Sequence, residues 1–238
     1  KNEINLGVVG AAGKMGLAII QRAMLDEEFS DIYPFEYLGF SDDSINIYNQ
    51  RENKIVPLHL IKGIDNFTKK LDVLIDFSLP SSTEITLRYA SEVGVPLVIG
   101  TTGIDSLSST IDELSKDIPI FVSPNMSIGV NLCFKLAGLA RQTLGKSYDV
   151  EIIEAHHRGK RDAPSGTALN FGKIIADVTG EDLSVNAVYE RKGLDSGREE
   201  NAIGFQTIRA GDIVGDHTVL FASEGERIEI THRATNRT

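Results

Sequence analysis

The sequence has a single cysteine and no long apolar run. Cys133 therefore has no intrachain disulfide partner, and no apolar stretch approaches the roughly 20 residues of a membrane-spanning helix. Basic residues are also few, because 24 Lys and Arg stand against 34 Asp and Glu, giving a formal net charge of -10. This balance argues against general binding to nucleic acids or membrane surfaces. We expect a cytoplasmic protein that binds neither.

The printed sequence also shows no repeat, low-complexity segment or flexible linker. Its first residues lead into an apolar run without a charged and apolar leader, so we expect no signal peptide. With 238 residues, of which 41% are hydrophobic and 24% charged, the composition is ordinary for a globular protein of one large or two modest domains.

A glycine-rich turn, GAAGKMG at 10–16, follows the apolar run 4–9 and precedes a stretch of helical composition at 17–24. Its spacing is Gly-x-x-Gly-x-x-Gly rather than Gly-x-Gly-x-x-Gly, but both allow a tight turn and bring the backbone close to a pyrophosphate. The strand-turn-helix order favours a dinucleotide site over a plain glycine turn. The residues expected to contact the dinucleotide here are Gly10, Ala11, Ala12, Gly13, Lys14 and Met15.

A second strand is expected over 35–41, ending before two adjacent acidic residues, Asp42 and Asp43. Asp42 could accept hydrogen bonds from the adenosine ribose, and an ordinary turn is an equal alternative. If Asp42 binds the ribose, a 2'-phosphate would meet two like charges, which predicts a preference for NADH over NADPH. Residues 45–70 indicate short strands and a helix start near Asp65.

Apolar runs at 71–77, 96–99 and 119–122 predict further buried parallel strands, with helices over 83–93 and 106–116. Ligands of open parallel sheets bind beyond the carboxyl ends of the strands, so the turns there are expected to contact the cofactor. The residues concerned are Ser78 after the first of these strands, Gly100, Thr101 and Thr102 after the second, and Ser123, Pro124, Asn125 and Met126 after the third, over the nicotinamide.

The pattern changes after residue 129. Helices are expected over 130–144 and 166–178, and strands over 148–154, 183–190, 202–209, 217–223 and 226–232. These elements predict a mixed sheet with two helices on one face and the other face free to pair with another subunit. The expected fold class is α/β. A Rossmann-like dinucleotide-binding domain (1–127, with a return segment 232–238) precedes an α+β substrate-binding and oligomerisation domain (128–231).

The segment EAHHRGKRDAPSGT at 154–167 concentrates cations in an acidic chain. Its six positions 156–161 hold five cationic or potentially cationic side chains: His156, His157, Arg158, Lys160 and Arg161. Asp162 or Ser165 can then cap a helix, and Gly166 lets a ligand approach the backbone. The segment predicts an anion site made of cations and helix N-terminal amides, with a solvated basic loop as the alternative.

The paired histidines bear on the chemistry of this segment. Repulsion from nearby Arg and Lys should lower their pKa values, so that one stays neutral and one can donate a proton near neutrality. A zinc site needs separated ligands, usually with help from a carboxylate or thiolate, and adjacent histidines point in different directions, so no metal site is expected.

Taken together, these motifs resemble the bacterial and plant dihydrodipicolinate reductases (4-hydroxy-tetrahydrodipicolinate reductases). The resemblance rests on GAAGKMG at 10–16, DFSLP at 76–80, GTTG at 100–103, SPNMSIGVN at 123–131, EAHHRGKRDAPSGTA at 154–168 and IRAGDIVGDHTVLF at 208–221. It implies transfer of a hydride from NADH or NADPH to a cyclic imine dicarboxylate in lysine and diaminopimelate synthesis. It also implies a cytoplasmic homotetramer.

The resemblance further implies that His156 and Lys160 serve as acid and base. Contacts to the substrate carboxylates would then fall on His157, Lys160, Ser165, Gly166 and Thr167. A dianionic substrate agrees with the cations gathered in an acidic chain.

Two features depart from the family pattern. Asp43 stands where the family often has an arginine, and the family continues beyond Thr238 with a helix that returns to the first domain. Two other classes remain open at this stage. A sugar or inositol dehydrogenase would lack the carboxylate cradle at 165–167, and a non-catalytic dinucleotide sensor would have no use for His156 and Lys160.

Overall fold

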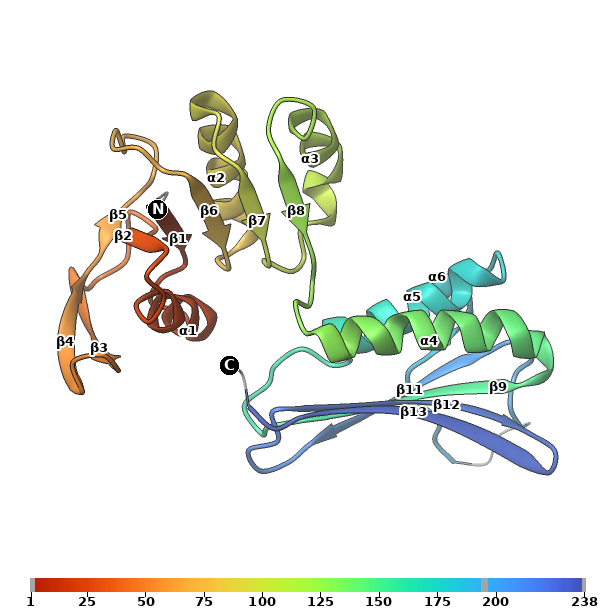
Figure 1. Cartoon of the computed structure of the whole chain (residues 1–238). Helices are drawn as coiled ribbons and strands as arrows, with labels where there is room; N and C mark the ends of the chain where they lie inside the picture. Colours follow the sequence, from red (N-terminus) through yellow and green to blue (C-terminus); the bar gives the residue numbers. More distant parts are fainter. Residues whose placement is uncertain (1–2, 194–196, 237–238) are drawn as a thin grey trace. The chain divides into compact units, whose positions relative to one another are not determined.

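The computed structural model describes residues 3–193 and 197–236 of the chain (Figure 1). The chain divides into two compact units, with the boundary between Pro124 and Asn125, slightly before the boundary expected after residue 127. The expected return segment 232–238 is corrected in its described part, because the strand β13 (Glu226–Ala234) pairs within the second sheet, and residues 237–238 lie outside the described residues.

A parallel sheet forms the centre of the first unit. Its strand order is β5-β2-β1-β6-β7-β8, and the order reverses direction at β1, where doubly wound folds bind dinucleotides. The strands are β1 (Ile4–Val9), β2 (Phe29–Glu36), β5 (Ile61–Lys62), β6 (Val73–Asp76), β7 (Leu97–Ile99) and β8 (Ile120–Val122). The helices are α1 (Lys14–Ala23), α2 (Pro80–Val93), α3 (Ser108–Leu114) and the 3-10 helix η1 (Asp105–Leu107).

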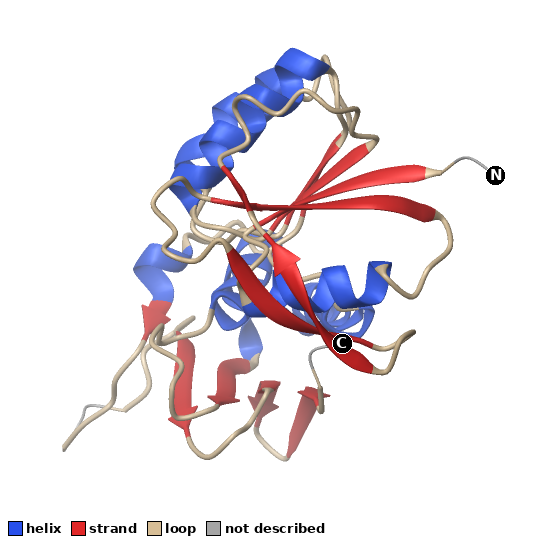
Figure 2. Cartoon of the chain, turned by 90° about the vertical axis from the view of Figure 1, so that its left-hand side faces the viewer, coloured by secondary structure: helices blue, strands red, loops and turns tan. Residues whose placement is uncertain are grey.

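Both faces of this sheet are covered. On one face Leu6 and Val8 pack with Ile20 of α1 and with Ile47 of the hairpin β3 (Ser44–Asn49) and β4 (Lys54–His59). On the other face the core contains residues of α2 and strand residues such as Leu74. Burial on both faces explains why these strands read as continuous apolar runs. The strands fan out with the usual twist in Figure 2.

The second strand lies earlier than the sequence predicts, because β2 ends at Glu36. Pro34 makes this strand hard to recognise in the sequence, because proline cannot donate a hydrogen bond to a neighbouring strand. The Phe35 carbonyl faces β1, where it accepts from the N–H of Gly10 (3.0 Å). The nitrogen of the preceding residue, Pro34, therefore faces the other side of β2. On that side β5 pairs only from Phe35 onward, so no hydrogen bond is lost at Pro34. Asp42 and Asp43 therefore lie in an exposed loop beyond the strand.

The second unit is a mixed sheet of order β10-β11-β9-β12-β13. Strands β10, β11 and β9 are parallel, and β12 and β13 are antiparallel to their neighbours. The strands are β9 (Asp149–His156), β10 (Ala187–Val188), β11 (Ile203–Arg209), β12 (Gly215–Ser223) and β13. The helices are α4 (Ile128–Leu144), α5 (Gly166–Val178), α6 (Leu183–Asn186) and the 3-10 helix η2 (Gly145–Ser147).

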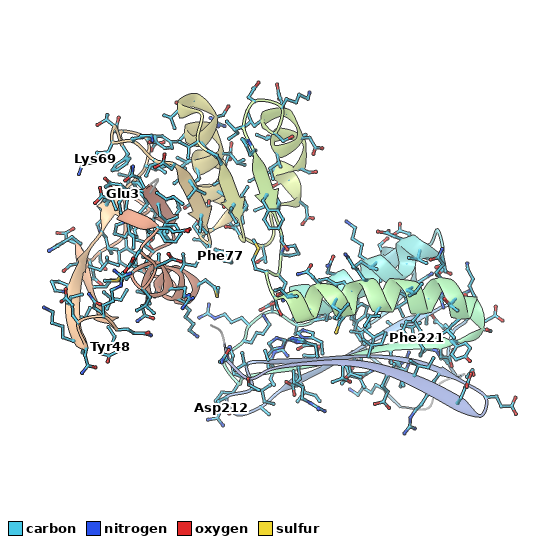
Figure 3. All side chains as sticks on the ribbon, in the orientation of Figure 1. Glu3, Tyr48, Lys69, Phe77, Asp212 and Phe221 are labelled. Atoms are coloured by element: carbon cyan, nitrogen blue, oxygen red, sulfur yellow. The ribbon has the colours of Figure 1, made fainter. Side chains whose placement is uncertain are left out.

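Helices α4 and α5 cover one face of this sheet (Figure 1). Phe134 of α4 meets Phe171 of α5 edge to face, with ring centroids 4.5 Å apart, and Phe221 of β12 belongs to the same core (Figure 3). The predicted mixed sheet with two helices on one face is thus confirmed.

Two smaller expectations were wrong. Residues 183–190 form α6 and the short β10 rather than one strand, because Asp182 accepts from the N–H of Ser184 (2.9 Å) and starts a helical turn. No helix starts near Asp65, where the described chain makes a turn.

Candidate active site

The glycine turn between β1 and α1 fits a dinucleotide. Gly10 has φ +78, and a Cβ there would lie 2.6 Å from the carbonyl oxygen of Phe77, so only glycine is accommodated. A Cβ on Gly16 would lie 2.2 Å from the Gly10 oxygen, which keeps helix and turn close. The N-cap Gly13 supplies no side-chain cap, so first-turn N–H groups of α1 remain available for a phosphate.

Glu36, rather than Asp42, is the acidic residue at the end of the second strand. Its Oε1 accepts from the N–H of Ala12 in the glycine turn (2.7 Å), and the residue is 8% exposed. The backbone around Asp42 is held instead by Lys62, whose Nζ donates to the carbonyl oxygens of Phe40 (2.7 Å) and Asp42. We expected Asp42 at the end of the second strand, beside the dinucleotide turn. The structure has Glu36 at this place instead.

Asp76 connects two of the predicted cofactor loops. Its buried Oδ1 accepts from the N–H of Ser78 (2.9 Å), from Ser78 Oγ (2.5 Å) and from Thr101 Oγ1 (3.2 Å). Burial raises the pKa of Asp76 although these hydrogen bonds oppose the shift. Next to this carboxylate, Gly100 leaves room for Phe77, because a Cβ would lie 2.1 Å from its ring. Ser78, Gly100 and Thr101 thus gather at the carboxyl edge of the sheet, and Thr102 follows in the exposed part of the turn.

The loop 123–126 is divided between the two units. Ser123 and exposed Pro124 end the first, and Asn125 and exposed Met126 begin the second. Within the second unit, Asn125 Nδ2 donates to Thr167 Oγ1 (3.2 Å). A residue predicted to contact the cofactor therefore touches one predicted to contact the substrate.

Strand β9 delivers the basic segment and ends at His156. Its inward residues are apolar at first and then become Glu154 and His156, which lie on the same face because side chains alternate along a strand. Nδ1 of His156 lies 2.5 Å from Oε2 of Glu154. Burial lowers the pKa of His156, Lys160 and Arg209 lower it further, and Glu154 opposes them. The predicted direction is confirmed, with burial as the main cause.

Arg209, at the end of β11, donates from Nη1 to Oε2 of Glu154 (2.8 Å) and from Nη2 to Oε1 of Glu154 (2.7 Å). Its Nη2 also donates to the carbonyl oxygen of Asp162 (2.5 Å). Burial would raise the pKa of Glu154, but hydrogen bonds from Arg209 and His156 outweigh it and lower the pKa. Glu154 is therefore held as a buried carboxylate.

Of the two caps that the sequence allows, Asp162 and Ser165, the structure uses Ser165, whose Oγ accepts from the N–H of Ala168 (3.2 Å). The same Oγ lies 3.0 Å from Nε2 of buried His217. Burial and repulsion by His156 lower the pKa of His217 to about 4, so this imidazole is neutral at pH 7. At exposed Gly166 a Cβ would meet no atom within 4 Å, so the start of α5 is open to a ligand.

The remaining residues of the basic segment differ in exposure. Lys160 is partly buried, and its Nζ lies 2.8 Å from Asp162 Oδ2. His157 and Thr167 are half-buried, and Arg158 and Arg161 are exposed. The structure thus brings His156, Ser165 and the start of α5 together, and the charge of Lys160 helps to lower the pKa values of His156 and His217.

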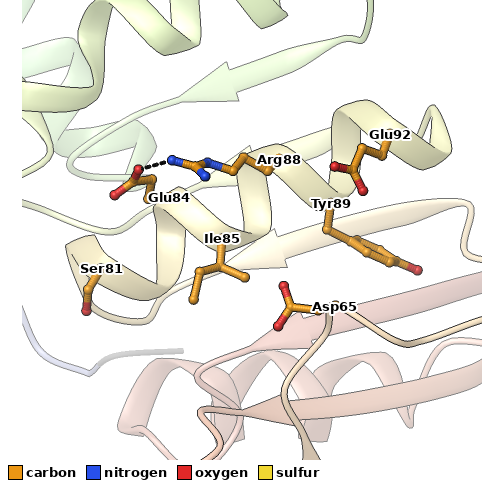
Figure 4. Close-up of a pocket in the computed structure, with 7 residues that line it drawn as sticks. All are labelled: Asp65, Ser81, Glu84, Ile85, Arg88, Tyr89 and Glu92. Carbon is orange, nitrogen blue, oxygen red and sulfur yellow. Dashed lines mark hydrogen bonds and ion pairs between the residues drawn. The ribbon is translucent and has the colours of Figure 1, made fainter.

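A surface hollow of about 400 Å³ lies on α2 of the first unit, and none of these residues lines it (Figure 4). Its acidic lining does not suit an anion, and its one arginine, Arg88, pairs with Glu84 at 2.5 Å. The lining residues are Asp65, Ser81, Glu84, Ile85, Arg88, Tyr89 and Glu92. In the described part of the chain no three His, Cys, Asp or Glu side chains cluster as metal ligands, and no helix is long and apolar enough to cross a membrane.

Sequence reasoning missed four residues of these sites. Glu154 could have been found from its position two residues before His156 on the same strand face. Arg209 and His217 lie in the motif at 208–221, but only strand pairing brings them beside β9, where His217 is directly opposite Glu154. Glu36 was hidden by the misplaced strand.

The two-unit fold, the dinucleotide turn and the anion site define an NAD(P)H-dependent oxidoreductase with a small anionic substrate. Residues 4–126 match the family described as dihydrodipicolinate reductase, N-terminus, and residues 129–238 match dihydrodipicolinate reductase, C-terminus. The chain therefore belongs to the dihydrodipicolinate reductase family.

Individual relatives agree with this assignment. The chain is 43% identical over 236 residues to the 4-hydroxy-tetrahydrodipicolinate reductase of Dechloromonas aromatica and 46% identical over 235 residues to that of Alkalilimnicola ehrlichii. Each alignment covers 98% of this chain and 87% of the relative. A dipicolinate-bound dihydrodipicolinate reductase from Paenisporosarcina sp. TG-14 is similar in structure, with a TM-score of 0.68, 26% identity and coverage of 98% of this chain and 89% of that one.

Proposed function

We propose that the chain reduces 4-hydroxy-tetrahydrodipicolinate to tetrahydrodipicolinate in lysine and diaminopimelate synthesis. This proposal rests on one observation: in a chain of net charge -10, a segment of cationic side chains leads directly into α5, whose first turn is open to a ligand. Such a site suits a dicarboxylate. The first unit would bind the nucleotide and the second the substrate.

The nucleotide would be held by the glycine turn, by the free amides of α1 and by the residues at the ends of β6 and β7. When bound, it supplies the hydride. The loop 123–126 would contribute Ser123, Pro124, Asn125 and Met126 around the nicotinamide.

The second unit would bind and protonate the substrate. His157, Lys160, Ser165, Gly166 and Thr167 would contact its carboxylates. His156 or Lys160 would donate the proton that balances the added hydride, because hydride addition to an unsaturated carbon leaves negative charge that must be quenched. His156 is the stronger candidate, since its Nδ1 faces Glu154 and no described residue hydrogen-bonds to its Nε2.

Glu36 supports a preference for NADH over NADPH. A carboxylate at the end of β2 can accept from the ribose hydroxyls, whereas a 2'-phosphate would bring like charges together. The residue that follows is Tyr37, which is 52% exposed and offers no positive charge.

We also propose that the protein acts in the cytoplasm as a homotetramer. Supporting assembly, the face of the second sheet opposite α4 and α5 carries apolar side chains such as Ile208, which is 47% exposed, together with half-buried Ile153 and Leu220. Light scattering coupled to size exclusion would measure the subunit number.

The function is tested by coupling the protein to a dihydrodipicolinate synthase, which makes the substrate in situ, and following the consumption of NADH and NADPH. No turnover with either nucleotide would refute the activity. Lys160→Ala should weaken substrate binding and turnover while NADH binding hardly changes, and Lys173→Ala, on the exposed side of α5, is its control. Loss of NADH affinity with normal turnover at saturation would show that the basic segment does not bind substrate.

A further inference from the structure

The carboxylate of Glu154 joins three groups of the second unit. Oε2 lies 2.5 Å from Nδ1 of His156, and Oε1 accepts from the backbone N–H of Ser165 at 3.1 Å. Both oxygens also accept from Arg209. The side chain is only 1% exposed. One buried group therefore contacts both the proposed proton donor and the cap of the helix proposed to bind carboxylate.

We propose that Glu154 is a positioning residue of the reaction, which holds the His156 imidazole with Nδ1 inward and Nε2 as the proton-donating nitrogen. This inference rests on the proposed role of His156. A carboxylate that accepts from one imidazole nitrogen fixes both the ring and its tautomer, and it favours the protonated ring. Because Glu154 also accepts from Ser165, it would hold donor and carboxylate cradle at a constant separation.

The surroundings of Nε2 agree with this role. A Cβ on Gly215 of β12 would lie 3.1 Å from Nε2, so the missing side chain at this position leaves that nitrogen space. Among the described residues no group hydrogen-bonds to Nε2, whereas Nδ1 has a close partner in Glu154. The proton that can leave is therefore the one on Nε2, and the proton on Nδ1 stays with the carboxylate.

The charges that face His156 act in opposite directions. Glu154, on the same strand, favours the imidazolium, and Arg209 and Lys160 disfavour it. His217, on β12, has its ring centroid 5.0 Å from that of His156. Asp162 lies beside Lys160. Removing the charge of Glu154 should therefore lower the pKa of His156 further, and removing the charge of Arg209 should raise it.

The experiment compares Glu154→Gln with Arg209→Gln. We expect Glu154→Gln to reduce kcat by about tenfold or more, as orienting partners of functional histidines often do. The pKa of His156, followed by NMR titration and in the pH profile of kcat/KM, should fall in Glu154→Gln and rise in Arg209→Gln. A purely structural role would not shift it in opposite directions. If Glu154→Gln does not fold, the rise in Arg209→Gln and rescue of activity by Glu154→Asp still test the proposal.

Glu181→Gln is the matched control. Glu181 is also a carboxylate of the second unit with little exposure, 8% for its side chain, and it pairs with buried Arg141 at 3.1 Å and with Lys146 at 2.9 Å. Its substitution removes a comparable carboxylate without touching His156, so the His156 pKa should not move.

A double-mutant cycle with His156→Asn separates this inference from the proposed function. If Glu154 acts through His156, adding Glu154→Gln to His156→Asn should change turnover little. Full turnover in His156→Asn alone would remove His156 from the mechanism, and the inference would fall with it. If His156→Asn is impaired but Glu154→Gln adds its full loss to it, or leaves the His156 pKa unchanged, only the role of Glu154 is refuted.

Discussion

The side-chain amide of Asn125 donates a hydrogen bond to Thr167 Oγ1 over 3.2 Å. Asn125 is itself held, because its Oδ1 accepts from the N–H of Ser127 at 2.9 Å and its carbonyl accepts from Asn131 Nδ2 at 2.8 Å. Ser127 in turn caps α4 through the N–H of Val130. The start of α5, where the substrate carboxylate is proposed to bind, is therefore tied to the start of α4.

Asn125→Ala should raise the KM for the substrate several-fold. A hydrogen bond of this kind contributes about 1 kcal/mol, and its loss frees the Thr167 side chain. Steady-state kinetics with substrate made in situ, together with the Kd for NADH, would measure the effect. Thr167→Ser, which keeps the hydroxyl, is the control, and Thr167→Val should resemble Asn125→Ala. Additive losses in the double variant Asn125→Ala, Thr167→Val would show that the bond does not matter for binding.

Gly166→Val should abolish activity while the fold stays nearly as stable. The position is exposed and a Cβ there meets no atom within 4 Å, so the added side chain enters the open space before α5, where a substrate carboxylate would meet the backbone amides. Activity and the thermal midpoint measured on the same preparation would separate the two effects. Wild-type turnover in this variant would mean that the carboxylate binds elsewhere.

Local patterns in the sequence were sufficient for most elements. The glycine turn, the apolar strands other than the second, and α5 depend on neighbouring residues, and they were predicted correctly. His156 and Ser165 were likewise predicted as site residues from one continuous segment. Their proximity followed from the short stretch of chain between them.

The parts that could not be predicted depend on pairing between distant segments. His217 lies opposite Glu154 only because β12 pairs with β9, and Arg209 reaches Glu154 only because β11 pairs with β9. Similarly, Pro34 predicts a break in the strand, but β5 does not pair with β2 at this residue, so proline is accommodated there. The misplaced strand then led to the expectation of Asp42 at the strand end, where the structure has Glu36.

The nucleotide preference should respond to substitution beside Glu36 rather than beside Asp42. One close like-charge pair at a partly exposed site costs a few kcal/mol before screening, and about 1 kcal/mol remains in salt, which predicts several-fold discrimination in favour of NADH. Tyr37→Arg should move the kcat/KM ratio towards NADPH. Asp43→Arg, the substitution that the sequence alone suggests, should move it less, because Asp43 is exposed and lies 3.8 Å from Lys62. A ratio that favours NADPH in the unmodified protein would contradict the role of Glu36.

His217 should make the second unit less stable as the pH falls from about 6.5 to about 4. Its pKa is about 4 in the folded chain against an ordinary value of 6.5, so in this window the unfolded chain binds a proton that the folded chain does not. Stability from this group is therefore complete above pH 6.5, declines as the pH falls and levels off below about 4. The difference of about 2.5 pH units corresponds to at most about 3 kcal/mol. Glu154, whose pKa is lowered, adds its own loss only at lower pH.

The measurement is the free energy of unfolding between pH 7 and pH 4.5 for the parent, His217→Gln and His59→Gln. His217→Gln should reduce the slope, because glutamine does not titrate, and should leave the part due to His156, whose pKa burial also lowers. The Nε2 of the glutamine can still donate to Ser165 Oγ, which His217 contacts at 3.0 Å. His59 is exposed, so its substitution should leave the slope unchanged. A parent whose stability does not vary over this range, or a His217→Gln variant with the parent slope, would show that the buried imidazole is not held neutral. Because the same imidazole contacts the cap of α5, a reduced slope with retained substrate binding would also show that the partner of Ser165 at this position does not need to titrate.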